Sequence, residues 1–256
     1  MTTLPDPIVA SFIRDEDEIQ LFRWPREGAE RIVLVHGIGM GHAVYDRFVE
    51  RISEEVDVTA VDLPGFGDAA EPKHAASIPH TADLLAAALR DQGLTPATAV
   101  GHSMGAQVVA ELAARHPDAV DRAVLVAPTV NARERSVRRQ ALRMLEDIAR
   151  GREPAVIAKG MTAYLRTGPR WFVKKLGPTL EHRIERTLPR VAQPTLVLRG
   201  VLDPVCPRDW AIRITSLLPR GEMLQLEGRG HEALISSGEP VARRVVDWMR
   251  STPVDR

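Results

Sequence analysis

The sequence predicts an α/β fold built on a doubly wound, mostly parallel sheet, with a helical segment inserted after the sixth strand. Three observations predict this fold. Short apolar runs rich in β-branched residues, such as Arg31–Val35, are typical of strands buried on both faces. These runs alternate with segments of helical periodicity, which is the order found in right-handed parallel sheets. From residue 131 to residue 190 the strand-like runs stop and only helical periodicity remains.

The first half of the chain contains five of the expected strands. The first two alternate loosely on either side of the acidic cluster Asp15–Glu18, which predicts two edge strands and a turn. The fourth ends at Asp62–Gly67, where one proline and two glycines enforce a loop. In chain order these strands are expected at residues 8–13, 19–24, 31–35, 56–61 and 97–100, and helices are expected through 49–52 and over 80–90.

The second half continues this pattern on both sides of the insertion. A sixth strand at Arg122–Val126 precedes it, and the alternation resumes with Thr195–Leu198. We therefore expect one core made of residues 1–130 and 191–256, with residues 131–190 forming a helical cap, or lid. The remaining elements are expected as a strand at 223–226, core helices over 106–114, 210–217 and 239–249, and insertion helices through 137–148, 154–165 and 170–188.

Composition limits the classes of function. The 256 residues include 34 basic and 34 acidic side chains, so no global charge favours nucleic acid or another charged partner. The single cysteine, Cys206, cannot form an internal disulfide, which fits a reducing compartment. No secretory leader or membrane-length apolar run is recognisable. These features predict a cytoplasmic protein that binds a small molecule, neither nucleic acid nor a membrane, and they leave the oligomeric state open.

The insertion nevertheless carries an excess of positive charge, with 15 Lys or Arg against 6 Asp or Glu. Its first helix has an apolar stripe through Val137, Ala141 and Met144, and the arginines fall mainly on the opposite side. They are expected to form a solvated face, and the alternative is a cleft that attracts anionic substrates. The first interpretation favours an uncharged substrate. The arginines concerned are Arg133, Arg135, Arg138, Arg139 and Arg143.

The candidate nucleophile is Ser103, which lies in the sequence Gly101-His102-Ser103-Met104-Gly105. A strand is expected before this Gly-x-Ser-x-Gly string and a helix after it. At such a strand–turn–helix elbow the serine is held in a strained conformation, and only small residues fit two positions to either side. Gly101 and Gly105 meet that need. The string also arises in ordinary glycine-rich turns, so the context of strand and helix carries the interpretation.

A serine hydroxyl needs a base and a group that orients the base. The two strands after the insertion are each followed by a loop with one suitable side chain, Asp203 and then His231. Asp209 and Glu227 compete for the acid role. Among the other histidines, His102 is expected to point away from the hydroxyl, and His36 to stabilise a turn. We therefore assign Ser103 as nucleophile, His231 as base and Asp203 as the orienting acid.

A tetrahedral intermediate also needs two donors for its oxyanion. One is expected to be the backbone N–H of Met104, at the start of the helix after the serine, and the other that of Ile38, in the glycine-rich loop after the third strand. The alternative for this loop is phosphate binding. Its glycines lack the spacing of a dinucleotide fingerprint, and it has no P-loop lysine.

Together, His36-Gly37, Asp62–Gly67, Gly101–Gly105, Asp203 and His231 resemble the α/β-hydrolase superfamily over nearly the whole chain. The resemblance implies an α/β-hydrolase fold with a cap that sets substrate choice, and a serine nucleophile is unlike the epoxide hydrolase and haloalkane dehalogenase branches. Small bacterial carboxylesterases are the most similar group. Carbon–carbon bond hydrolases of the meta-cleavage-product type resemble it more distantly, since they commonly have asparagine at His102 and tryptophan at Glu232.

The resulting expectation is a carboxylic ester hydrolase that forms an acyl-enzyme and needs no metal or cofactor. Two alternatives remain open: a carbon–carbon bond hydrolase, and a ligand receptor on a hydrolase fold. An intact triad argues against the receptor. Tyr164 and Trp171 are the cap aromatics that could contact substrate, although core packing is the commoner role of such residues.

Overall fold

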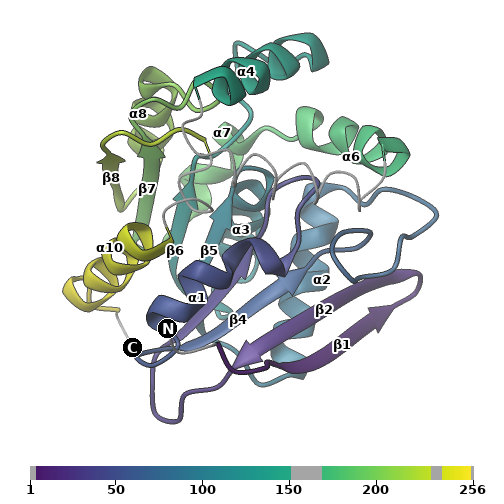
Figure 1. The fold of residues 1–256 in the computed structure, drawn as a ribbon, viewed down its shortest axis with the longest axis vertical. Coiled ribbons are helices and arrows are strands. Elements are labelled where there is room, and N and C mark those ends of the chain that lie inside the picture. Colours follow the sequence, from purple (N-terminus) through teal and green to yellow (C-terminus); the bar gives the residue numbers. More distant parts are fainter. Residues whose placement is uncertain (1–3, 151–168, 232–237, 255–256) are drawn as a thin grey trace.

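The computed structural model describes residues 4–150, 169–231 and 238–254, and it contains one eight-stranded sheet (Figure 1). The strand order is β1-β2-β4-β3-β5-β6-β7-β8. β1 and β2 pair antiparallel, as does β2 with β4, and every other pair is parallel. The strands are β1 (Ile8–Arg14), β2 (Asp17–Trp24), β3 (Arg31–Val35), β4 (Asp57–Asp62), β5 (Ala97–His102), β6 (Val120–Val126), β7 (Thr195–Gly200) and β8 (Gly221–Leu226). The predicted fold class is confirmed.

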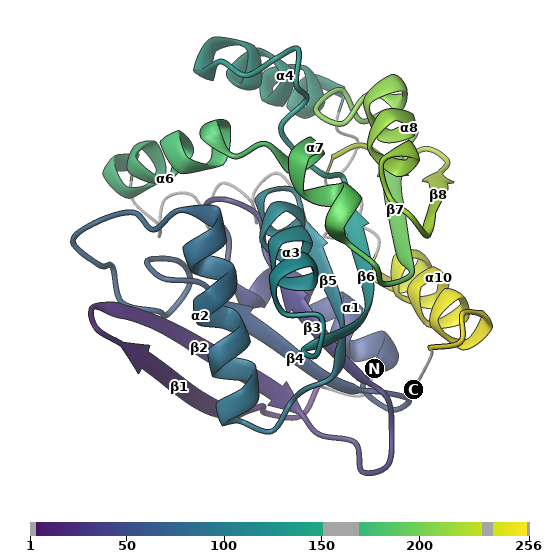
Figure 2. The ribbon, with the colours of Figure 1, turned by 180° about the vertical axis from the view of Figure 1, so that it is seen from behind.

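Helices cover both faces of this sheet. α1 and α10 pack against each other on one face, and α2 and α3 lie together on the other (Figures 1 and 2). β3 to β7 consist almost entirely of buried side chains, because the runs of β-branched and small residues meet helices above and below. The core helices are α1 (Asp46–Ile52), α2 (Ile78–Asp91), α3 (Met104–Arg115), α8 (Arg208–Ser216) and α10 (Gly238–Ser251), with a 3₁₀ turn, η1 (His42–Tyr45), before α1.

The segment between β6 and β7 is helical in its described part, as predicted. It contains α4 (Val137–Arg150), α6 (Pro169–Glu181), α7 (Ile184–Thr187) and the 3₁₀ turn η2 (Leu188–Arg190). The single helix expected over 170–188 is interrupted at His182 and Arg183. The helix expected over 154–165, with Tyr164, lies outside the described residues.

Helix α4 is oriented opposite to the expectation. Its predicted apolar stripe is largely exposed, since Val137 and Ala141 are exposed and Met144 is half-buried. The nearby Leu142 and Leu145 retain 65% and 64% of their accessible surface. The reason is that the polar side of the helix finds partners inside the protein. Arg143 donates to Glu134 and Glu146, and the carboxylate of Asp147 is buried.

The arginines of this region therefore do not form the single solvated face that was expected. Arg138 and Arg139 are exposed, as predicted. Arg135, by contrast, is half-buried and pairs with Glu185 of α7 at 2.5 Å. This arginine ties the start of the insertion to its end. Within the described ranges, no helix combines the length and apolarity that crossing a membrane requires.

Candidate active site

Ser103 lies on a sharp turn between β5 and α3. Its φ is +55°, in the region that L-residues rarely adopt, and its backbone N–H donates to the carbonyl of Val126 on β6. The two flanking glycines are required by contact: a Cβ on Gly101 would lie 2.3 Å from the carbonyl oxygen of Gly105, and one on Gly105 would lie 2.2 Å from that of Val35. The elbow geometry thus follows from how closely β3, β5 and α3 pack.

The structure brings Ser103, His231 and Asp203 together in one buried cluster. His231 Nε2 lies 3.1 Å from Ser103 Oγ, and His231 Nδ1 lies 3.0 Å from Asp203 Oδ2. Gly200, at the end of β7, allows the loop after β8 to approach, because a Cβ there would lie 2.3 Å from the carbonyl oxygen of Arg229. The residues therefore come from the carboxyl ends of three parallel strands, where ligands of such sheets bind.

Asp203 is the carboxylate that is hydrogen-bonded to His231. Its Oδ1 accepts the N–H groups of Val205 and Cys206, at 2.8 and 2.9 Å, which leaves Oδ2 for His231. Burial raises the pKa of the Asp203 carboxyl, but the charge and hydrogen bonds of His231 and the two backbone donors outweigh burial and hold that pKa below its ordinary value. The competing acids lie elsewhere: Asp209 is exposed opposite Arg133, and Glu227 is exposed.

Two further histidines shape the surroundings without contacting Ser103 Oγ. His36 Nε2 accepts the N–H of Leu63, so its Nδ1 carries the proton and donates to the carbonyl of Gly37. The bond from Leu63 to His36 joins the ends of β3 and β4. His102 is buried, and its Nε2 donates to the backbone carbonyl of His231 at 2.9 Å. Burial lowers the pKa of both imidazoles, that of His102 to about 3, so both rings are neutral.

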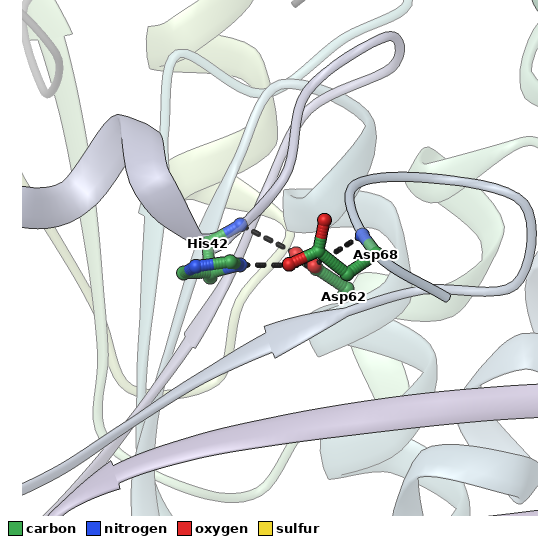
Figure 3. A group of neighbouring side chains, drawn as sticks. All are labelled: His42, Asp62 and Asp68. Atoms are coloured by element: carbon green, nitrogen blue, oxygen red, sulfur yellow. Dashed lines mark hydrogen bonds and ion pairs between the residues drawn. The ribbon is translucent and has the colours of Figure 1, made fainter. Parts of the chain in front are cut away.

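A cluster that the sequence did not predict braces the loop after β3 (Figure 3). The buried carboxylate of Asp62 accepts the backbone N–H and the ring Nδ1–H of His42, and also the N–H of Asp68. Gly41 and Gly67 touch here, since a Cβ on Gly41 would lie 2.7 Å from the Cα of Gly67. His42, Asp62 and Asp68 are close enough to share a metal ion. Because three N–H donors already occupy the Asp62 oxygens, this cluster acts as a brace between two loops.

Of the two expected oxyanion donors, Met104 directly follows Ser103 and Ile38 directly follows Gly37. Met104 is the first residue of α3, where helix N–H groups have no partner within the helix. Ile38 lies in a turn closed by the Met40 N–H to the Gly37 carbonyl. Gly37 lies against the elbow, because a Cβ on it would be 3.3 Å from Ser103 Cβ.

Sequence reasoning missed one hydroxyl beside the nucleophile. Thr129 Oγ1 is 3.5 Å from Ser103 Oγ and is buried. Its loop is fixed by Trp210, whose Nε1 donates to the carbonyl of Pro128. The signal that could have found Thr129 is its place just after β6, because polar residues at carboxyl ends of strands were the criterion used for Asp203 and His231.

Of Tyr164 and Trp171, the two insertion aromatics singled out from the sequence, Trp171 lies in the described residues and Tyr164 does not. Trp171 is buried on α6 and packs against the loop after β4, so a Cβ on Gly65 would collide with its ring at 2.2 Å. Its centroid lies 6.3 Å from that of Phe66. The insertion therefore contacts the same edge of the sheet as the Ser103 cluster.

Comparison with known proteins agrees with this architecture. The sequence profile described as "Alpha/beta hydrolase family" matches residues 32–244. Two relatives align over most of their length. The pimeloyl-[acyl-carrier protein] methyl ester esterase of Vibrio cholerae is 26% identical, over 88% of this chain and 96% of the relative. The (E)-2-((N-methylformamido)methylene)succinate hydrolase of Acinetobacter baylyi is 24% identical, over 88% of this chain and 92% of the relative.

Solved structures share the fold. An enol-lactonase from Burkholderia xenovorans superposes with a TM-score of 0.81 at 19% identity, covering 94% of this chain and 100% of that one. A thermophilic esterase from Thermogutta terrifontis superposes with a TM-score of 0.80 at 22% identity, covering 96% of this chain and 99% of that one.

Proposed function

The chain belongs to the alpha/beta hydrolase family, and we propose that it is a serine hydrolase that cleaves a small or medium, uncharged carboxylic ester. Ser103 is its nucleophile, His231 its general base and Asp203 the acid that orients the base. The observation that carries this proposal is the continuous chain of contacts from Ser103 Oγ through the imidazole to Asp203, at 3.1 and 3.0 Å. The proposed reaction needs only side-chain and backbone groups of the chain and a water molecule, and it takes place in the cytoplasm.

The proposed reaction has two halves. Ser103 Oγ attacks the ester carbonyl carbon while its proton passes to His231 Nε2, and the N–H groups of Met104 and Ile38 stabilise the resulting oxyanion. The intermediate collapses, the C–O bond to the alcohol breaks, and Nε2–H protonates the departing alkoxide. Water then attacks the acyl-enzyme with His231 again as base, which releases the carboxylic acid and restores Ser103.

The lowered pKa of Asp203 supports its assigned role, because the carboxylate stays ionised and can stabilise the imidazolium that forms next to it. Cys206 is a poor alternative nucleophile. It is fully buried, and burial raises the pKa of its thiol well above the ordinary value.

We further propose that residues 131–190 form a cap that sets substrate choice. Trp171 of α6 packs against the loop after β4. Asp147 of α4 accepts the backbone N–H of His231, in the loop after β8. Both helices therefore contact loops at the same end of the strands as Ser103. The Vibrio relative is named for a methyl ester of an acyl chain. Methyl esters of increasing acyl length should therefore be compared in the wild type and in Trp171→Ala, and a cap role predicts that the preferred length changes.

The decisive experiment is labelling with a fluorophosphonate, followed by turnover of a chromogenic short-chain ester. We expect the label on the peptide that contains Ser103 and its loss in Ser103→Ala. Turnover of a ring-fission product in place of the ester would instead favour the carbon–carbon bond hydrolase. A protein that is neither labelled nor active on esters would contradict the proposal and favour a receptor.

A further inference from the structure

The backbone of His231 is held from both sides by side chains that belong to different parts of the molecule. Its N–H donates to Asp147 Oδ1 at 2.9 Å, and its carbonyl accepts from His102 Nε2 at 2.9 Å. His102 belongs to the nucleophile elbow. Asp147 belongs to α4, in the insertion, and precedes His231 by 84 residues.

These two backbone hydrogen bonds keep His231 in a fixed position, which a catalytic base requires. His231 lies in a loop, and the residues before it are Gly228-Arg229-Gly230, with Gly228 at a φ of +68°. Two nearby glycines give this segment little stiffness of its own. The ring contacts cannot supply all of the rigidity either, because Nε2 must change from acceptor to donor during each turnover. Contacts to the flanking peptide groups hold the ring in place while the bonds of the ring change.

Asp147 is well suited to this contact. Its side chain is 8% exposed, although it lies on a helix whose apolar side faces solvent. The preceding residue, Glu146, points to Arg143 at 2.9 Å, so the two neighbouring carboxylates have different partners. A carboxylate that accepts a backbone N–H forms a charge-assisted hydrogen bond, which is stronger than a neutral one.

We propose that Asp147 is a positioning residue for the catalytic base, and that through it the insertion sets the geometry of the triad. The catalytic consequence rests on the function proposed above. When α4 lies in its observed place, the peptide before the imidazole is fixed and Nε2 points at Ser103. Displacement of α4 breaks this bond and removes one of the two backbone contacts that hold the base in place. The insertion thus controls the competence of the base in addition to the shape of the substrate site.

The kinetic test compares three variants with a soluble short-chain ester. Asp147→Ala removes the acceptor, and we expect kcat to fall on the order of 10- to 100-fold with little change in KM, since small misplacement of a catalytic group has effects of this size. Asp147→Asn keeps an oxygen that can accept the N–H, and we expect it to retain most of the activity. Glu146→Ala, on the same helix, is the matched control and should be as active as the wild type.

A second measurement needs no turnover. The proton on His231 Nδ1, hydrogen-bonded to Asp203, is expected to give a low-field proton resonance. We expect this signal in the wild type, in Asp147→Asn and in Glu146→Ala, and its loss or a marked shift in Asp147→Ala. Thermal melting of each variant shows whether the fold is kept.

The outcomes separate the two proposals. Equal loss in Asp147→Ala and Asp147→Asn would show that the charge matters and not the hydrogen bond, which would overturn the positioning role. So would an unchanged resonance and unchanged kcat in Asp147→Ala. If the wild type fails to hydrolyse esters or to react with fluorophosphonate, the proposed function fails, while the resonance still decides whether Asp147 positions His231.

Discussion

The nucleophile elbow and helix α4 bury opposite kinds of side chain. Around Ser103, the strand before it and the helix after it are packed on all sides, and α3 buries every residue from Met104 to Ala113. In α4 the side chains that turn inward are polar, and apolar ones such as Leu142 and Leu145 face solvent. The elbow is held by apolar burial and close backbone contact, and α4 by hydrogen bonds and ion pairs.

Because of this difference, one part of the candidate site is fixed in place and the other is adjustable. Apolar packing at crystal-like density tolerates little displacement, so Ser103 stays where β5 and α3 put it. The Arg143–Glu134 ion pair is directional but partly exposed, so it exchanges with water more readily than buried apolar contacts do. Ser103 thus belongs to the rigid region, and Asp147 links the adjustable region to the backbone of His231.

The largest expected effect concerns the elbow itself. Ser103→Ala should lower kcat by at least about 10⁴-fold, because the acyl-enzyme cannot form. The free energy of unfolding should stay close to that of the wild type or rise, since the strained turn is kept and only a hydroxyl is lost. Steady-state ester hydrolysis and urea denaturation measure the two quantities. Near wild-type hydrolysis would mean that the elbow does not carry the chemistry.

Asp203→Asn should lower kcat on the order of 10³- to 10⁴-fold, because an amide neither stabilises the imidazolium nor holds the required tautomer. The matched control is Asp209→Asn, on the exposed side of α8, which should leave kcat unchanged. If the control loses as much activity as Asp203→Asn, the acid has been assigned to the wrong loop.

One substitution made in both helices tests the comparison directly. Leu112 of α3 is fully buried and Leu145 of α4 is mostly exposed. Leu112→Ala should lower the free energy of unfolding by about 2–5 kcal/mol. Leu145→Ala should change it by less than about 0.5 kcal/mol. Chemical denaturation measures both, and a loss above about 2 kcal/mol for Leu145→Ala would show that the apolar side of α4 is covered in solution.

Lys175 of α6 provides a pH-dependent test of how the insertion contacts the core. Its buried Nζ donates to the carbonyl of Ala76 at 2.9 Å, and burial lowers its pKa to about 8. Between pH 8 and about 10 the unfolded chain therefore binds more protons than the folded one, so stability rises with pH, by at most about 1.4 kcal/mol per unit. The free energy of unfolding of the wild type, relative to Lys175→Met, should rise across this window, and a flat difference would contradict it.

The smallest effect is expected from salt. Among the described residues of the insertion, Arg138 and Arg139 are exposed, whereas Arg135 and Arg143 are paired with carboxylates. The ratio kcat/KM for a neutral ester and for an isosteric anionic ester should therefore both stay nearly flat from low to high ionic strength. A steep fall confined to the anionic ester would show that unpaired cations face the substrate.

The sequence located the central strands β3 to β7 because each contains a short run of β-branched or small residues, which is a local signal. It located Ser103 for the same reason, because Gly101 and Gly105 lie two positions from the serine in sequence and the turn has no room for a side chain at either position. The pairing with Asp203 and His231 followed from chain order along a parallel sheet, and the structure places all three together.

The orientation of α4 could not be predicted in this way. Periodicity shows that one side of a helix is apolar, but it does not show which side the rest of the protein covers. The partner of Arg135 lies 50 residues away, and the partner of Asp147 lies 84 residues away. A lone carboxylate in a helix gives no signal of such a contact.

The three residues of the proposed triad follow β5, β7 and β8, and β8 is one of the two edge strands of the sheet. Ser103 and His231 are separated by 128 residues, so their contact is among the most non-local in the chain. During synthesis or refolding, the serine has no base beside it until the last strand pairs with β7. On the proposed function, a partly folded chain therefore hydrolyses no ester, and the return of hydrolytic activity during refolding reports when β8 docks on β7.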